Sequence, residues 1–344
     1  MSVEQKFQIL EKLGEGAYSI VYKVKRKKDK QIYALKKVNL EKLSEKEIEN
    51  ALNEVRILAS LKSTNIISYK EAFIDQKDNN LCIIMEYCDD GDLLQKIMEN
   101  QKNGSFFQEE DIWNIFIQVV KALEILHQLK ILHRDMKSAN IFLNKDKTIK
   151  LGDLNVAKIK KKGFLHTQTG TPYYASPEVW KDEPYDEKSD IWSLGCVLYE
   201  MASSHPPFRA QDLNGLFKKV TSGVYGKIPS FYSNDLQFIL KQLLQVLKEN
   251  LVPQESFWLP KIQNLRFSSL DVVQGNNKNN EEDIIQKKKV HQHSMSVGKK
   301  LKVLQTPQKQ NINTYPQKSK HIVNLNLMAN IQESYQKKYR KTFE

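Results

Sequence analysis

The hydrophobic and polar positions at the start of the chain follow the period of β-strands. Apolar and polar residues alternate from Phe7 onward and again beyond a turn with two glycines at residues 14–16, which predicts a hairpin. The segment at residues 33–36 predicts another strand, and the continuous apolar run at residues 81–85 predicts a buried one. The chain is therefore expected to begin with a strand-rich region.

Helical periodicity marks most of the remaining apolar segments, in which apolar residues recur three and four positions apart. Ser44 followed by Glu47 forms a capping box, and Asp92 is predicted to cap the helix that follows it. Asp190 begins a strongly apolar helix, and we expect it to cap backbone amides rather than take part in chemistry. Helices are predicted at residues 44–61, 108–129, 189–201 and 236–247.

Three polar motifs lie between these helices and carry the candidate chemistry. The first motif, at residues 133–140, combines a basic residue, a carboxylate, a second cation and an amide. Such a set can hold a hydroxyl nucleophile, a phosphate and a divalent ion together. We interpret Asp135 as the base that orients the attacking hydroxyl and Lys137 as the phosphate clamp. Asn140 and Asp153 are the candidate Mg²⁺ ligands, because hard cations prefer oxygen ligands. The motifs are His-Arg-Asp-Met-Lys-Ser-Ala-Asn at residues 133–140, Leu-Gly-Asp-Leu-Asn at 151–155 and Gly-Thr-Pro-Tyr-Tyr-Ala-Ser-Pro-Glu at 170–178.

This spacing resembles the catalytic loop and the metal-binding triplet of eukaryotic protein kinases. The resemblance implies an α+β, bilobal kinase fold within residues 1–265, with ATP and Mg²⁺ as cofactors and proteins as substrates. A small antiparallel-sheet N-lobe is expected at about residues 1–86, and a larger helical C-lobe with atypical last helices at about 89–265. Residues 266–344 are expected to form a basic, low-complexity, disordered tail.

The same resemblance assigns residues to the nucleotide. Alternation along the strand directs Lys36 inward and Lys37 to solvent, and the resemblance implies that Lys36 holds the phosphates and pairs with Glu54. For Glu54 the alternative is an ordinary solvated carboxylate, and a lone Gly-x-Gly is more often a plain turn. Met85 is expected behind the adenine, with the backbone after it reading the adenine edge. The implied nucleotide-binding residues are Gly14, Glu15, Gly16, Val21, Ala34, Lys36, Met85, Glu86, Cys88, Asn140 and Asp153.

Other segments narrow the resemblance to the NIMA-related (Nek) serine/threonine kinases, of the type found in ciliates and flagellates. The segments that carry it are residues 53–56, 170–180 and 206–210. Thr171 would belong to the pocket for the residue after the phospho-acceptor, and Thr167 matches the activating phosphorylation site, with Thr169 as the competing site. A phosphate on Thr167 would pair with Arg134. The resemblance suggests cell-cycle, ciliary or cytoskeletal regulation.

Two departures from the family pattern define a rival interpretation. Asn155 stands where glycine is usual, so we expect metal binding to be kept and the loop to flip less readily. The stretch at residues 247–253 lacks the arginine that pairs with Glu178 in the family, which leaves Lys248 or Arg266 as substitutes, or altered last helices. Both departures favour the rival, a pseudokinase scaffold that binds a nucleotide without transferring its phosphoryl group.

Most of the net positive charge lies in the C-terminal part of the chain. The net charge is +12, of which residues 255–344 carry +9 from 16 basic and 7 acidic residues. The basic clusters are either solvated linker or an electrostatic contact for an acidic surface such as a microtubule, anionic lipid or RNA. A cytoskeletal adaptor acting through this tail is thus a third interpretation. The sequence contains no motif for sequence-specific nucleic-acid binding.

Cysteine usage and hydropathy bear on the compartment. Cys82, Cys88 and Cys196 lie in apolar surroundings without paired spacing, so we expect a reducing compartment and neither a disulfide framework nor a zinc site. The first residues lack a secretory apolar region, and no apolar run approaches the roughly 20 residues that span a bilayer. We expect a cytoplasmic protein; the resemblance adds the cytoskeleton, basal body or cilium.

Overall fold

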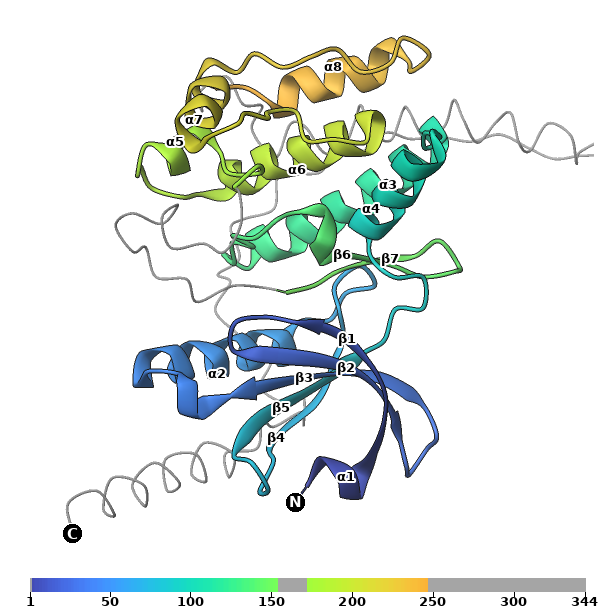
Figure 1. The fold of residues 1–344 in the computed structure, drawn as a ribbon, viewed down its shortest axis with the longest axis vertical. Helices are drawn as coiled ribbons and strands as arrows, with labels where there is room; N and C mark the ends of the chain where they lie inside the picture. The colour runs from blue at the N-terminus through green and yellow to red at the C-terminus, as the bar shows by residue number, and fades with distance from the viewer. Residues whose placement is uncertain (1, 154–171, 247–344) are drawn as a thin grey trace, which may run out of the picture. The chain divides into compact units, whose positions relative to one another are not determined.

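The structure, a computed structural model, describes residues 2–153 and 172–246, with the side chain of Glu54 excepted (Figure 1). These residues belong to one compact unit. Several positions singled out by the sequence lie outside the described residues, and their predictions stay predictions. They are Asn155, Thr167, Thr169, Thr171, Lys248, Arg266 and the tail at residues 266–344.

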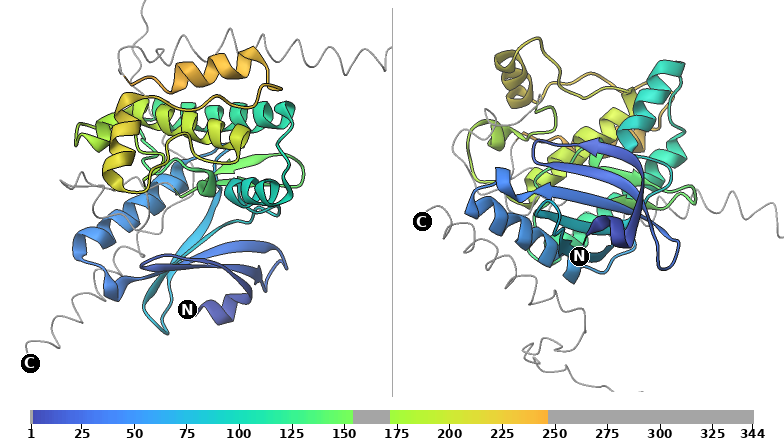
Figure 2. Two further views of the ribbon diagram at one scale, coloured as in Figure 1. Left: turned by 45° about the horizontal axis from the view of Figure 1, so that its top comes forward. Right: turned by 60° about the horizontal axis from the view of Figure 1, so that its bottom comes forward.

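An antiparallel sheet of five strands forms the first part, in the order β1-β2-β3-β5-β4 (Figures 1 and 2). The predicted hairpin and the two later strands are confirmed. The β1–β2 hairpin carries two register shifts, next to Glu11 and next to Gly14, where the pairing is irregular. The strands are β1 (Phe7–Glu15), β2 (Ser19–Arg26), β3 (Ile32–Asn39), β4 (Tyr69–Ile74) and β5 (Asn80–Glu86).

Helix α2 (Glu45–Ser60) follows β3 and buries its apolar face on the sheet. The predicted capping box at its start is confirmed: the Ser44 hydroxyl accepts from the Glu47 amide, and the Glu47 carboxylate accepts from the Ser44 amide. Val38 packs in the cluster with α2, whereas Tyr33 and Leu35 pack in a second cluster. The short helix α1 (Val3–Lys6) contributes to the second cluster, and the 3₁₀ turn η1 (Leu40–Lys42) links β3 to α2.

The expectation that Lys37 faces solvent is wrong. Strand alternation does place it opposite to Lys36, but the side chain is only 21% exposed and forms ion pairs with Asp75, at 3.3 Å, and Asp78. These ion pairs raise the pKa of Lys37 above its ordinary value, although burial acts in the opposite direction. The carboxylates come from the β4–β5 connection, which periodicity within β3 cannot reveal.

The second part is mainly helical, and α6 (Glu187–Ser203) lies between α4 (Glu109–Gln128) and α8 (Asn234–Leu243) in Figures 1 and 2. Gly195 permits the close approach of α6 and α8, since a Cβ there would lie 2.8 Å from the Leu243 Cβ. Asp92 caps α3 as predicted, accepting from the Gln95 amide at 3.0 Å. The remaining elements are α3 (Leu93–Asn103), η2 (Ser138–Asn140), β6 (Ile141–Leu143), β7 (Ile149–Leu151), α5 (Pro177–Trp180) and α7 (Leu213–Ser222).

Two sequence expectations about the chain as a whole can be compared with the described residues. All three cysteines are buried free thiols, and burial raises the pKa of Cys82 and of Cys88 to about 12. Within residues 2–153 and 172–246, no helix has the length and apolar character needed to cross a bilayer.

Helix α8 ends at Leu243, four residues earlier than periodicity predicts.

Candidate active site

The segment between α4 and β6 brings its polar side chains together at Asp135. The Lys137 ammonium lies 3.0 Å from Asp135 Oδ2. The η2 turn carries Asn140 back toward the same residue, so that its Nδ2 donates to Asp135 O at 2.7 Å and to Asp135 Oδ2 at 3.3 Å. A cation and an amide therefore fix the orientation of the half-buried carboxylate that the sequence singled out.

Asp153 reaches the same region from the end of β7. Its backbone is left-handed, with φ of 54°, and the preceding Gly152 amide donates to Asn140 O at 3.0 Å. A Cβ at Gly152 would lie 2.7 Å from the Phe142 ring and 2.9 Å from Ile67, so only glycine fits without displacement. The glycine thereby lets Asp153 sit beside the segment that carries Asn140.

Lys36 completes the arrangement from β3, with its ammonium 2.8 Å from Asp153 Oδ1. The surrounding protein atoms act to raise the pKa of Asp153, but the Lys36 charge outweighs them and holds that pKa below its ordinary value. Asp153 is therefore ionised at neutral pH. The predicted pairing of Lys36 with Glu54 concerns a side chain outside the described residues.

Asp190 at the start of α6 anchors the segment, as the sequence predicted. Its carboxylate is fully buried and accepts from the backbone amides of His133, at 2.9 Å, and Arg134, at 3.0 Å. It also accepts from the Tyr185 hydroxyl and lies 2.8 Å from His127 Nε2 on α4. Burial acts to raise the pKa of Asp190, but these hydrogen bonds and nearby histidines hold it below its ordinary value.

His133 links the catalytic segment, which comprises residues 133–140, to Gly152. The ring is fully buried, and burial lowers its pKa, so the imidazole is neutral. Its Nδ1 accepts from the Asp135 amide at 3.3 Å, which leaves Nε2–H to donate to Gly152 O at 3.1 Å. The neutral imidazole thus bridges the two motifs that carry Asp135 and Asp153.

The residues assigned to the nucleotide lie on neighbouring strands. Gly14 pairs with Val21, and Val21 pairs with Lys36, so these three form one row across β1, β2 and β3. Ala34 pairs with Met85 of β5 in the same sheet. The turn after β1 is closed by the Gly16 amide, which donates to Ser19 O at 2.7 Å, while the exposed Glu15 side chain pairs with Lys12.

Two of the residues assigned to the nucleotide lie at the end of β5 and just beyond it. Glu86 Oε1 accepts from the Ser68 amide at 2.6 Å and lies 3.0 Å from the Lys150 ammonium on β7. Cys88 is buried. That the backbone after Met85 reads the adenine edge stays a prediction.

Glu178, for which the sequence left the partner open, accepts a hydrogen bond from the Ser189 hydroxyl in the first turn of α6. Glu178 as a whole residue is 5% exposed. The substitutes considered from the sequence, Lys248 and Arg266, lie outside the described residues. Sequence reasoning missed Ser189, His133 and Gly152 as supporting residues, although the first lies next to Asp190 and the other two lie within the quoted motifs.

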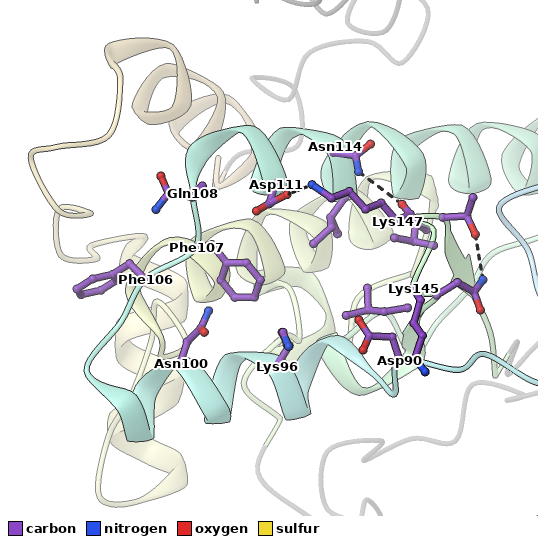
Figure 3. Close-up of a pocket in the computed structure, with 15 residues that line it drawn as sticks. Asp90, Lys96, Asn100, Phe106, Phe107, Gln108, Asp111, Asn114, Lys145 and Lys147 are labelled. Atoms are coloured by element: carbon purple, nitrogen blue, oxygen red, sulfur yellow. Dashed lines mark hydrogen bonds and ion pairs between the residues drawn. The ribbon is translucent and has the colours of Figure 1, made fainter. Parts of the chain in front are cut away.

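A cavity of about 370 Å³ lies elsewhere, between α3, α4 and the β6–β7 hairpin (Figure 3). Phe107 and the ion pair between Asp111 and Lys147, at 3.1 Å, belong to its lining. None of the residues predicted for catalysis, nucleotide or metal lines it. The cavity is therefore separate from the candidate active site.

Comparisons with known proteins agree with this geometry. The model of the protein kinase domain family matches residues 7–252. The serine/threonine-protein kinase Nek1 of Mus musculus is 42% identical over 243 residues, 70% of this chain and 20% of its own length. Nek5 of Homo sapiens is 36% identical over 283 residues, 77% of this chain and 39% of its own length.

A fungal relative extends the same group. The G2-specific protein kinase nim-1 of Neurospora crassa is 37% identical over 273 residues, which cover 72% of this chain and 32% of the relative. This chain spans less than half the length of each of these three relatives. The match over residues 7–252 and the arrangement around Asp135 and Asp153 lead to one conclusion: the chain belongs to the protein kinase domain family, and the relatives named here are NIMA-related kinases.

Proposed function

We propose that the chain transfers the γ-phosphoryl group of ATP to serine and threonine hydroxyls of protein substrates. The observation that carries the proposal is the convergence of Asp135, Asn140, Asp153 and Lys36 in one hydrogen-bonded arrangement. Phosphoryl transfer requires positioning and charge neutralisation rather than covalent chemistry by the protein, and these four side chains supply both. The serine/threonine kinase names of the relatives support the same reaction.

The donor set fits Mg²⁺. Because Asn140 donates through Nδ2 to Asp135, its carbonyl oxygen is left as the ligand atom, and the ionised Asp153 supplies a carboxylate. Mg²⁺ is commonly held by one or two such groups together with substrate phosphates. When bound, it would neutralise the charge of the phosphates. Among residues 2–153 and 172–246, no group of three or more His, Cys, Asp and Glu side chains could hold a metal.

The residues of the chain divide the remaining work. Lys36, which already faces the Asp153 carboxylate, attracts the phosphates of the nucleotide. The Asp135 carboxylate accepts a hydrogen bond from the substrate hydroxyl and thereby orients that hydroxyl. Lys137 and Asn140 hold the carboxylate in place. Lys137 then lies where it can offset negative charge on the transferred group.

The cellular setting belongs to the proposal as well. The name of nim-1 describes that kinase as G2-specific, which supports a role of this chain in cell-cycle regulation. The proposal extends to ciliary or cytoskeletal regulation. We infer a cytoplasmic or cytoskeletal location and an electrostatic contact of the basic residues at 255–344 with an acidic surface such as a microtubule. Activation by phosphorylation at Thr167 or Thr169 is inferred on the same footing.

A radiolabel assay tests the proposed reaction. The full chain is incubated with γ-³²P-ATP, Mg²⁺ and casein, and compared with Asp153→Ala and with Asp235→Asn, a matched change at an exposed carboxylate on α8. Labelling of casein by the wild type and by Asp235→Asn, but not by Asp153→Ala, is expected. A folded wild type that binds ATP yet transfers no label, even with Thr167→Glu, would favour the pseudokinase scaffold.

A further inference from the structure

Helix α6 carries a row of buried polar side chains on one face. Ser189, Ser193 and Glu200 are spaced four and seven residues apart, so they share a face of the helix. Their exposed fractions are 0%, 6% and 4%. Buried polar groups of this kind are costly unless they are hydrogen-bonded, so their partners reveal what the row holds.

All three side chains hold the segment at residues 172–178. The Ser189 hydroxyl donates to the Glu178 carboxylate. The Ser193 hydroxyl donates to the backbone carbonyl of Tyr174 at 2.8 Å, and Glu200 Oε2 accepts from the Tyr174 hydroxyl at 2.7 Å. Tyr174 is therefore held at both its backbone and its side chain by residues two helical turns apart.

Tyr174 also reaches the catalytic segment. Its hydroxyl oxygen lies 2.9 Å from the hydroxyl of Ser138, which is fully buried and follows Lys137 directly. Because a phenol has one hydrogen and Tyr174 gives it to Glu200, the Ser138 hydroxyl donates to the phenol oxygen. Burial raises the pKa of Glu200, although the hydrogen bond from the Tyr174 hydroxyl opposes that shift.

We propose that Ser138, Tyr174 and Glu200 are positioning residues that fix the segment at residues 172–178 against the catalytic segment and so present the acceptor hydroxyl to Asp135. The inference rests on the proposed kinase function. Its geometric basis is a continuous chain of hydrogen bonds from a residue next to Lys137 to the fourth turn of α6. Small displacements of a reacting group are costly in rate, and a displacement of about 1 Å can cost 10²-fold.

The proposal separates transfer from nucleotide binding. Lys36 and Asp153, which face the nucleotide, lie on β3 and at the end of β7, and neither contributes to the chain of hydrogen bonds. Removing the phenol hydroxyl should therefore lower the kcat for casein while the Kd for Mg-ATP stays unchanged. A merely structural contribution would instead lower thermal stability and leave the kcat of the folded enzyme intact.

The test compares Tyr174→Phe with Tyr173→Phe in the full chain. Both tyrosines pack against the same cluster of α6 and α7, and both are half-buried. Tyr173→Phe therefore removes one hydroxyl from a comparable environment and serves as the matched control. We expect Tyr174→Phe to lower the kcat for casein about 10-fold and Tyr173→Phe to leave it within 2-fold. Glu200→Gln, which keeps the size of the side chain, should lower the kcat in the same direction as Tyr174→Phe.

A double-mutant cycle decides whether Ser138 acts through Tyr174. If it does, Ser138→Ala combined with Tyr174→Phe should be no slower than Tyr174→Phe alone. Additive losses of kcat in the double variant would overturn the inference, and so would a Tyr174→Phe enzyme as fast as Tyr173→Phe. In either case, phosphoryl transfer by the wild type would still support the proposed kinase function. A wild type that transfers no phosphate would refute the proposed function, and the inference would fall with it.

Discussion

Replacing Asp190 with asparagine removes the acceptor on which the catalytic segment is anchored. The carboxylate is fully buried, and it accepts from the His133 and Arg134 amides, from Tyr185 and from His127. Asparagine has the same shape but only one acceptor oxygen, so about half of these donors lose their partner. Hydrogen bonds to charged groups contribute about 1.5–3 kcal/mol each. We expect Asp190→Asn to lower the free energy of unfolding by about 3–5 kcal/mol.

This loss is large compared with a typical domain stability of about 5–15 kcal/mol. It corresponds to a fall in Tm of roughly 6–20 °C, measurable by circular dichroism. Asp111→Asn is the matched control, because its carboxylate is 42% exposed and pairs with Lys147, and such pairs contribute about 0–1 kcal/mol. A Tm of Asp190→Asn within 2 °C of that control would refute the anchoring role.

The pH dependence of the same variant has a definite sign. The folded-state pKa of Asp190 is held below its ordinary value, so the carboxylate stabilises the fold above the unfolded pKa of about 3.9 and loses this effect as the pH falls through the folded pKa. The stability difference between wild type and Asp190→Asn should therefore be full at pH 7 and shrink below about pH 4. A difference that grows on acidification would contradict the assignment.

Three further changes follow from the geometry. Gly152→Ala places a Cβ 2.7 Å from the Phe142 ring, so it should lower the free energy of unfolding in urea by about 1–3 kcal/mol. Because Asp153 follows directly, the same change should weaken Mg²⁺-dependent ATP binding, and unchanged ATP binding would count against this placement of Asp153. Asp92→Ala removes the cap of α3 and should cost about 1 kcal/mol in the same unfolding assay, whereas no loss would show that the cap is dispensable. Asp75→Asn weakens the nearly buried ion pair with Lys37 and should lower Tm by several degrees at neutral pH, and an unchanged Tm would mean that Asp78 suffices.

Local patterns in the sequence were sufficient for much of the fold. Alternation predicted the β1–β2 hairpin, and the Ser44–Glu47 capping box predicted the start of α2, because both depend on residues close in the chain. Asp190 was predicted to accept from backbone amides, and it does so from the first turn of α6, whose own N-cap is Asp186; the amides belong to His133 and Arg134. The hairpin and the capping box needed only residues that are neighbours in the chain, whereas the partners of Asp190 lie more than 50 residues away.

The features that the sequence did not reveal depend on contacts between distant segments. Lys37 is covered by carboxylates about 40 residues away, and Gly152 is required because of the ring of Phe142 on the neighbouring strand. The hydrogen bonds of Tyr174 join three segments that no periodicity relates. In the candidate site, the sequence motifs predicted which polar residues would converge. The hydrogen bonds that support these residues could be identified only in the folded structure.

The central claim is that Asp135, held by Lys137 and Asn140, orients a serine or threonine hydroxyl for transfer from Mg-ATP. It is tested most directly by comparing the initial rate of casein phosphorylation and the identity of the phosphorylated amino acid for wild type and Asp135→Asn, alongside ATP binding by calorimetry. We predict phosphoserine and phosphothreonine from the wild type, a rate at least about 10²-fold lower in the variant, and ATP binding of similar affinity in both. Transfer by Asp135→Asn at the wild-type rate would contradict the account.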